Sequence, residues 1–131
     1  MHITQALIIA AVAVSGCAFQ IAPTENNQTI SNVVVKLPPE RTFQNLVREA
    51  RTRCFPLTVD AQFYQGTQEG DVSFVTNYDA STQLVWAVFA IRPIGQDSAV
   101  TIRSPGRIKE FFEPATKWMN GEDAPCPVDR R

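Results

Sequence analysis

Residues 57–103, LTVDAQFYQGTQEGDVSFVTNYDASTQLVWAVFAIRPIGQDSAVTIR, decide the fold. At the start of this stretch apolar residues alternate with polar ones, at Leu57, Val59, Ala61 and Phe63. A period of two is typical of a half-buried strand. Short turns separate four segments with strand character: 57–64, 71–78, 83–92 and 99–103. Connections this short favour antiparallel neighbours, so the stretch predicts a four-stranded antiparallel meander.

An amphipathic helix is predicted on each side of the meander. The proline pair at 38–39 opens the first helix, because proline suits the first helical position. Its apolar residues follow at steps of three and four: Phe43, Leu46, Val47, Ala50 and Cys54. The second helix begins with Ser104 as its N-cap and Pro105 at its first position, and it ends at Gly121. Pro114 lies inside it, so we expect a kink or a break there.

These elements predict the fold class. Both helices carry apolar stripes that need cover, and one face of the meander provides it. We therefore expect a two-layer α+β sandwich in the order αββββα, with both helices on one face of the sheet. The 131 residues suit a single domain of this kind. The net charge of -1 lacks the basic excess of nucleic-acid-binding proteins, so we expect no nucleic-acid partner.

The N-terminus has the features of a signal peptide. An apolar run covers 6–14, too short to span a bilayer but of the length that export signals use. Small residues and a cysteine follow it: Val14, Ser15, Gly16 and Cys17. This order resembles the lipobox of bacterial lipoproteins, a motif that covers only the leader and Cys17. The other interpretation is an uncleaved apolar segment in which Cys17 is a buried small residue.

The lipobox resemblance implies a location. In that family the signal peptide, here 1–16, is removed, and the new N-terminal cysteine, here Cys17, carries acyl chains that hold the protein on a membrane. We expect the chain in the cell envelope, facing the periplasm. Ala18 replaces the aspartate that retains some lipoproteins in the inner membrane, which favours the outer membrane. Residues 17–32 are polar and predict a flexible tether, and 33–131 form the domain, with Val33, Val34 and Val35 as a short edge strand.

Cys54 and Cys126 are an even pair once Cys17 is assigned to lipidation. In an exported chain such a pair predicts a disulfide. A redox role is not favoured, because there is no Cys-x-x-Cys pair. The end of the chain, Trp118 to Gly121 followed by Cys126 and Pro127, also resembles the C-terminal ends of small proteobacterial lipoproteins. This second resemblance implies no activity.

Several kinds of catalysis lack their residues. The single histidine is His2, inside the expected signal peptide, so a mature chain has no imidazole for a Ser-His-Asp triad, a Cys-His pair or a zinc site. No glycine-rich phosphate loop is present. Carboxylates occur near strands and turns, at Asp60, Glu69, Asp71 and Asp79, but no spacing forces two of them together in a cleft. We therefore expect no enzyme, no cofactor and no metal site.

The candidate functional surface is an aromatic stripe on the sheet. The strand at 83–92 is apolar on both faces, so one of two rows points away from the helices. These rows are Leu84, Trp86, Val88 and Ala90, or Val85, Ala87, Phe89 and Ile91. Together with Tyr64, an outward Trp86 or Phe89 is a candidate interaction site. Alternatively the tether, the C-terminal tail or the sheet's twist covers the row.

A second candidate surface is the basic side of the first helix, at Arg41, Arg48 and Arg51. It suits anionic headgroups or an acidic partner, or it is an ordinary solvated helix face. The expected function is that of a non-enzymatic envelope lipoprotein, whose anchored domain binds a protein partner or serves envelope assembly. The alternative is a periplasmic binder of a small amphipathic ligand. A pocket lined by Trp86 or Phe89 favours the ligand, and a flat exposed stripe favours the protein partner.

Overall fold

The structure is a computed structural model that describes residues 19–21, 28–54, 57–77, 79–105 and 108–127. The expected signal peptide and Cys17 lie outside the described residues. The strands are β1 (Phe19–Ile21), β2 (Gln28–Val35), β3 (Thr58–Tyr64), β4 (Glu69–Asn77), β5 (Thr82–Ile94) and β6 (Asp97–Pro105). The helices are α1 (Pro39–Arg53), the 3₁₀ turn η2 (Ile108–Phe111) and α2 (Phe112–Met119). Among the described residues, no helix combines the length and the apolar character that a bilayer crossing requires.

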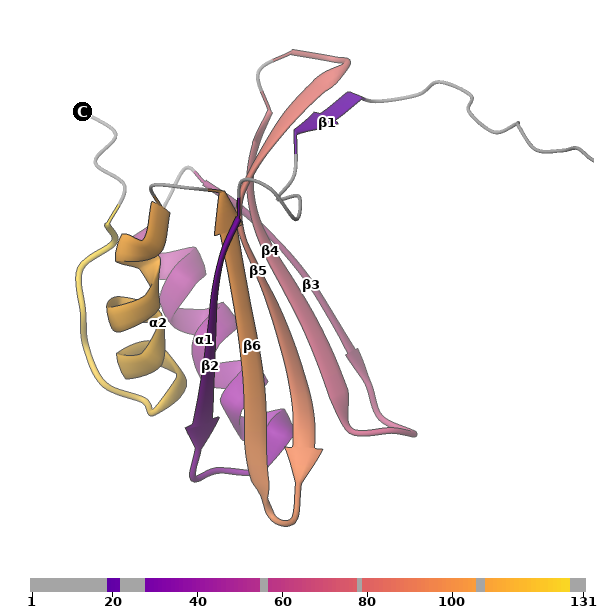
Figure 1. The fold of residues 1–131 in the computed structure, drawn as a ribbon, viewed down its shortest axis with the longest axis vertical. Coiled ribbons are helices and arrows are strands. Elements are labelled where there is room, and N and C mark those ends of the chain that lie inside the picture. Colours follow the sequence, from indigo (N-terminus) through magenta and orange to yellow (C-terminus); the bar gives the residue numbers. More distant parts are fainter. Residues whose placement is uncertain (1–18, 22–27, 55–56, 78, 106–107, 128–131) are drawn as a thin grey trace, which may run out of the picture.

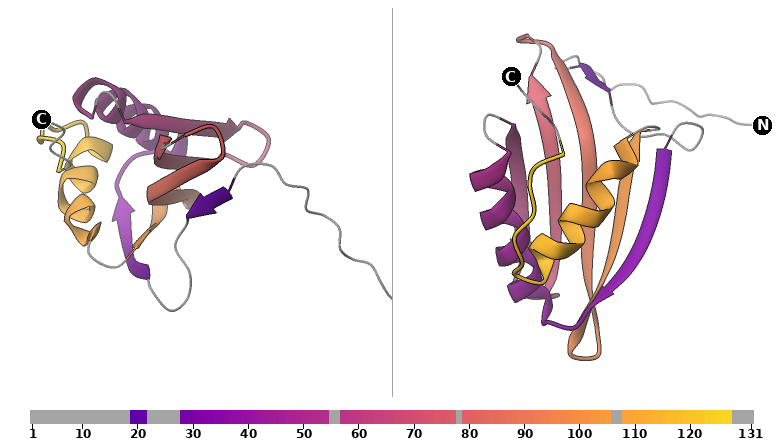
Figure 2. Two further views of the ribbon diagram at one scale, coloured as in Figure 1. Left: turned by 90° about the horizontal axis from the view of Figure 1, so that it is seen from above. Right: turned by 90° about the vertical axis from the view of Figure 1, so that its left-hand side faces the viewer.

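The fold is α+β with an antiparallel sheet covered by two helices (Figure 1). The strand order is β2-β6-β5-β4-β3, so the expected meander is present as β3 to β6. Both helices lie on the same side of the sheet, as the right-hand view of Figure 2 shows. The face of the sheet turned away from the helices is called the outer face below.

The four-strand expectation is wrong in strand number, because β2 adds a fifth antiparallel strand at one edge. β2 pairs with β6 over its full eight residues. It therefore includes 28–32, which we assigned to the tether. Short β1 is a further addition, and it pairs in parallel with the start of β5. An edge strand needs apolar residues on only one face. The polar residues of 28–32 are therefore compatible with a strand, although they made this segment resemble a tether.

Helix α1 follows the sequence expectation closely. Pro39 stands at its first position, and the backbone N–H of Cys54 closes it by donating to the carbonyl of Ala50. Its buried face includes Leu46 and Ala50, which pack on the sheet. Phe43, at the margin of this face, lies 5.2 Å from Phe63 between ring centroids.

The second helix differs from the expectation. Ser104 and Pro105 are the last residues of β6 and not a helix start. Ser104 pairs with Thr29 of β2, so the edge strand, which is longer than the expected 33–35, holds this segment extended. The helical part begins as the 3₁₀ turn and becomes α-helical at Phe112, which places Pro114 in the first turn of α2. A proline in the first turn of a helix costs no backbone hydrogen bond, so Pro114 does not interrupt α2. The break in the helical segment is the change from 3₁₀ turn to α-helix at Phe112, just before Pro114.

An aromatic cluster fills the space between the helices and the sheet. Phe74 on β4 is at its centre, with ring centroids 4.9 Å from Phe89, 5.4 Å from Phe111 and 6.4 Å from Trp118. All four side chains are fully buried. One hydrophobic core therefore joins both helical segments to the centre of the sheet.

Candidate functional site

The structure decides which row of β5 faces the helices. From Ala87 onward the helix-facing residues are Ala87, Phe89 and Ile91, which are buried in the core. Val88 and Ala90 alternate with them and lie on the outer face, partly exposed. Nearer the start of β5 the register shift reverses the alternation, so Val85 pairs with Val75 outside the core cluster and Trp86 packs against the core. Phe89 therefore belongs to the core and has no surface to offer a partner, and Trp86 is partly exposed while packing against the same core.

Trp86 lies at an irregularity of the sheet. The register between β4 and β5 shifts at this point, because Phe74 pairs with Ala87 while Val75 pairs with Val85. Trp86 is thus the extra residue of a β-bulge, a feature that redirects a side chain. Its indole Nε1 donates a 2.7 Å hydrogen bond to Thr76 Oγ1, and part of its ring packs against the core. Trp86 is accordingly held in place by the domain itself.

The third candidate, Tyr64, is far from Trp86. It ends β3 beside the β3–β4 turn, and 47% of it is exposed. Along the strands Trp86 is nearly level with Val59. Val59 of β3 pairs with Phe74 of β4, and Phe74 pairs with Ala87, the residue after Trp86. Five residues of strand at about 3.3 Å each put Tyr64 roughly 17 Å further along the sheet. The three predicted aromatic residues do not form one site.

Two of the large apolar side chains that are exposed among the described residues lie on β2, most of which was expected to be tether; the others are Tyr64 on β3 and Ile94 on β5. Ile30 is 48% exposed and Val34 is 56% exposed. Between them Asn32 accepts a 3.0 Å hydrogen bond from Thr101 of β6. Among the described residues β6 is the only strand beside β2, and the register between them contains no shift. This regular, partly apolar border of the sheet is called the β2 edge. The sequence feature that indicates this strand is the high proportion of β-branched residues in 29–35.

The opposite border of the sheet, β3, is better protected. The guanidinium of Arg51 on α1 donates a 3.0 Å hydrogen bond to the carbonyl of Val59. The exposed side chains of β3 include Asp60 and Gln62, a charge and a polar group of the kind that discourage edge pairing. Of the two edges, β2 is therefore the one suited to accept another strand.

The basic stripe of α1 is mostly engaged within the domain. Arg48 bonds to Asn45 and Glu49, and Arg51 bonds to β3 as described above. Glu49 also accepts a 2.8 Å bond from Arg53, and Arg53 in turn contacts Asp123 at 2.7 Å. The bond from Arg53, together with Arg48, lowers the pKa of the Glu49 carboxyl below its ordinary value. Arg48 and Arg51 are therefore engaged in contacts within the domain, and Arg41 is exposed.

The carboxylates near the strands also have structural partners. Arg92 contacts Asp71 at 3.2 Å and Glu69 at 3.8 Å. Asp79 accepts the backbone N–H of Ser81 at 2.8 Å, and this bond lowers the pKa of the Asp79 carboxyl. Within the part of the chain that the structure describes, no three His, Cys, Asp or Glu residues are grouped as metal ligands.

Two surface hollows lie away from the predicted aromatic residues. One, of about 250 Å³, lies between α2 and the end of the chain and is lined by Glu113, Pro114, Lys117, Ala124, Pro125, Cys126 and Pro127. The other, of about 420 Å³, is lined by Lys36, Pro38, Pro39, Gln68, Pro93, Gly95, Gln96 and Asp97. Neither hollow is lined by Trp86 or Phe89, so neither is the pocket that would favour the ligand hypothesis.

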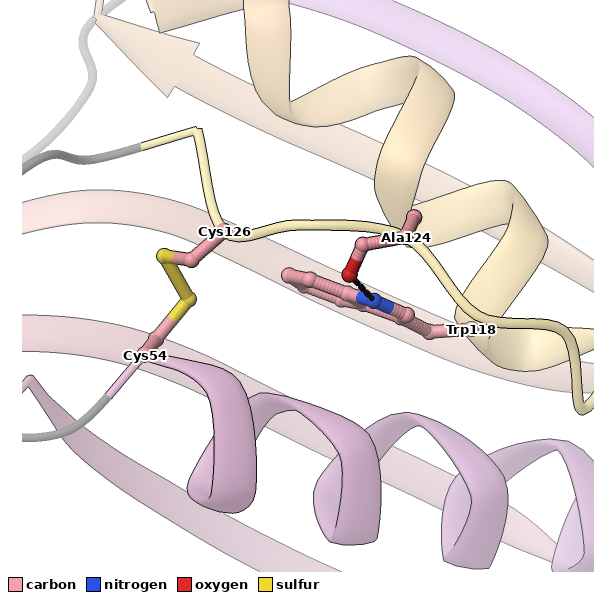
Figure 3. Close-up of a disulfide and its surroundings, with 4 residues drawn as sticks. All are labelled: Cys54, Trp118, Ala124 and Cys126. Atoms are coloured by element: carbon pink, nitrogen blue, oxygen red, sulfur yellow. Dashed lines mark hydrogen bonds between the residues drawn. A yellow bond between two sulfur atoms is a disulfide. The ribbon is translucent and has the colours of Figure 1, made fainter.

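The expected disulfide is confirmed. Cys54, at the end of α1, is bonded to Cys126 in the C-terminal tail (residues 120–127), with a Cα–Cα distance of 5.3 Å (Figure 3). Trp118 lies beneath the same tail and donates from Nε1 to the carbonyl of Ala124. The tail is therefore fixed to both helices, which supports a structural role for the bond.

No known protein-family model matches the chain, and no curated protein sequence matches it.

Proposed function

We propose that this chain is a non-enzymatic lipoprotein of the cell envelope, whose anchored domain binds an extended segment of a partner protein along the β2 edge. The observation that carries the binding proposal is the contrast between the two borders of the sheet. The β3 border is closed by Arg51 and by polar side chains, while the β2 edge is regular and exposes Ile30 and Val34.

The chemistry of the β2 edge defines the partner. A strand with one neighbour presents a row of backbone N–H and C=O groups, and another extended chain satisfies such a row. Ile30 and Val34 alternate with Asn32 on the outer face, which favours a partner strand with apolar residues at alternate positions. The occupant is thus an extended, alternately apolar segment of an envelope protein.

The envelope location has separate support. The lipobox-like end of the leader supplies the anchor at Cys17. The disulfide between Cys54 and Cys126 is of a kind that persists in oxidising compartments. The intact mass of the protein from its native host tests this part, since it reports cleavage before Cys17 and the attached acyl groups. A retained initiator methionine with no acyl mass would overturn it.

Site-specific photo-crosslinking in the native host tests the binding part. Crosslinkers placed singly at Ile30, Asn32 and Val34 should react with alternate residues of one continuous partner segment. The matched control is Gln62, which is exposed on β3 at the other border. A crosslinker there should give no such adduct. Equal adducts from both borders, scattered partner positions, or no adduct from β2 would each contradict the proposal.

A further inference from the structure

The chain enters the domain at one end of the sheet. Strand β1 pairs in parallel with the first residues of β5, Phe19 with Thr82 and Ile21 with Leu84. Figure 1 shows β1 beside the outermost part of the β4–β5 hairpin. Only Ala18 separates Cys17 from β1. With about 3.8 Å between consecutive Cα atoms, the Cα atom of Cys17 lies within about 8 Å of that of Phe19.

The domain has two distinct ends along its strands. The hairpin end carries the β4–β5 turn, and the far end carries the β5–β6 turn at Gly95 and Gln96 (Figure 1). Strand β5 has 13 residues and spans the distance between these turns. At about 3.3 Å per residue, the two ends are roughly 40 Å apart.

We infer that the hairpin end of the domain rests against the lipid surface, and that the β5–β6 turn is the part farthest from it. The inference rests on the proposed lipidation of Cys17, and it replaces the long flexible tether expected from the sequence. The exposed residues of the hairpin turn include Asn77, Asp79 and Ser81. A charged and polar turn suits contact with hydrated headgroups, because its transfer into hydrocarbon is unfavourable.

The orientation also sets how a partner reaches the β2 edge. β2 and β5 are both antiparallel to β6, so they run in the same direction. β5 starts at the hairpin end, and β2 therefore also runs away from the lipid surface. A segment paired with β2 accordingly runs between the membrane side and the far end of the domain.

Energy transfer from labelled protein to vesicles tests the orientation. Lipidated protein, verified by intact mass, is inserted into phosphatidylcholine vesicles that carry a headgroup acceptor. A donor is attached at Ala80→Cys in the hairpin turn or at Gln96→Cys in the far turn, both exposed positions. Because the sites are roughly 40 Å apart along β5, we expect transfer from Ala80 to be at least about tenfold faster.

A variant in β1 tests whether its pairing with β5 orients the domain. Gln20→Pro removes an N–H from β1 and disfavours its pairing with β5. If the pairing orients the domain, this variant should bring the two transfer rates much closer together. Equal rates in the unmodified background, or a ratio unaffected by Gln20→Pro, would overturn the inference. Absence of the acyl mass would instead contradict the proposed anchoring itself.

Discussion

The indole Nε1 of Trp118 donates a 2.8 Å hydrogen bond to the carbonyl oxygen of Ala124, two residues before the disulfide-bonded Cys126. Trp118 is 0% exposed and Ala124 is 7% exposed, so water cannot readily replace the indole as the donor. Asn45 on α1 anchors the preceding turn by donating to the carbonyl of Met119 at 3.1 Å. The tail that carries Cys126 is thus positioned by hydrogen bonds as well as by the covalent bond.

Trp118→Phe should lower the free energy of unfolding by about 1–3 kcal/mol, because it leaves the Ala124 carbonyl buried without a donor. Urea unfolding followed by circular dichroism measures this change. Trp86→Phe is the matched control, since it also removes an indole hydrogen bond, here to Thr76. Trp86 is partly exposed, so water can replace the lost donor and its effect should be smaller. An equal loss of unfolding free energy in both variants would show that the buried hydrogen bond to Ala124 adds no more stability than the partly exposed one to Thr76.

Removal of the disulfide should have a larger effect. Cys54 and Cys126 are 72 residues apart in sequence, and closing a loop of that length stabilises a fold by about 4 kcal/mol in the chain-entropy estimate. The double variant Cys54→Ala with Cys126→Ala should therefore unfold at a much lower urea concentration. Reduction of the unmodified protein with dithiothreitol is the control and should shift the midpoint similarly. An unchanged midpoint would show that the bond adds no stability.

The meander and α1 were predictable because their patterns are local. In β3 every second residue faces the core, and in α1 the apolar residues repeat at helical spacing, so each segment reports its own buried face. Of the edge strand β2 only 33–35 were predicted, since its pairing with β6 depends on a segment some 70 residues away in the chain. That same pairing extends β6 through Ser104, which removes the expected helix start.

The candidate site was less predictable than the fold. Both rows of β5 are apolar, so the strand alone does not tell which row faces the helices. The answer depends on its neighbours, because Val72 and Phe74 of β4 pair with Phe89 and Ala87. The bulge at Trp86 is likewise a property of two strands together. Ile30 was assigned to the tether because its neighbours are polar, and Val34 was placed in the edge strand without its exposure being predicted.

The Glu49 carboxyl should make stability depend on pH. Arg53 and Arg48 hold the pKa of this group below its ordinary value of 4.5. Since the folded-state pKa is lowered, the stabilisation is complete above the ordinary value and is lost as the pH falls through the folded-state value. Glu49→Gln should therefore be less stable than the unmodified protein at neutral pH, and the difference should shrink as the pH falls below 4.5 and Glu49 becomes protonated.

Urea midpoints measured across this pH range test the Glu49 prediction. Glu122→Gln is the control, because it also removes one negative charge but from an exposed position near the tail. Its effect should be small at every pH. A stability difference for Glu49→Gln that stays constant from neutral to acid pH would show that the carboxylate does not stabilise the fold through its charge.

A lysine on the β2 edge should separate binding from stability. Val34 is 56% exposed, so Val34→Lys should change the free energy of unfolding by no more than about 0.5 kcal/mol. Lysine on an edge strand opposes pairing with another strand, because the partner would have to desolvate its charge. The adduct formed by a crosslinker at Asn32 should therefore be lost in Val34→Lys, while the same substitution at Gln62 on β3 should leave it intact. If Val34→Lys retains the adduct, the partner does not pair with β2, and the outer face away from this edge would have to hold it.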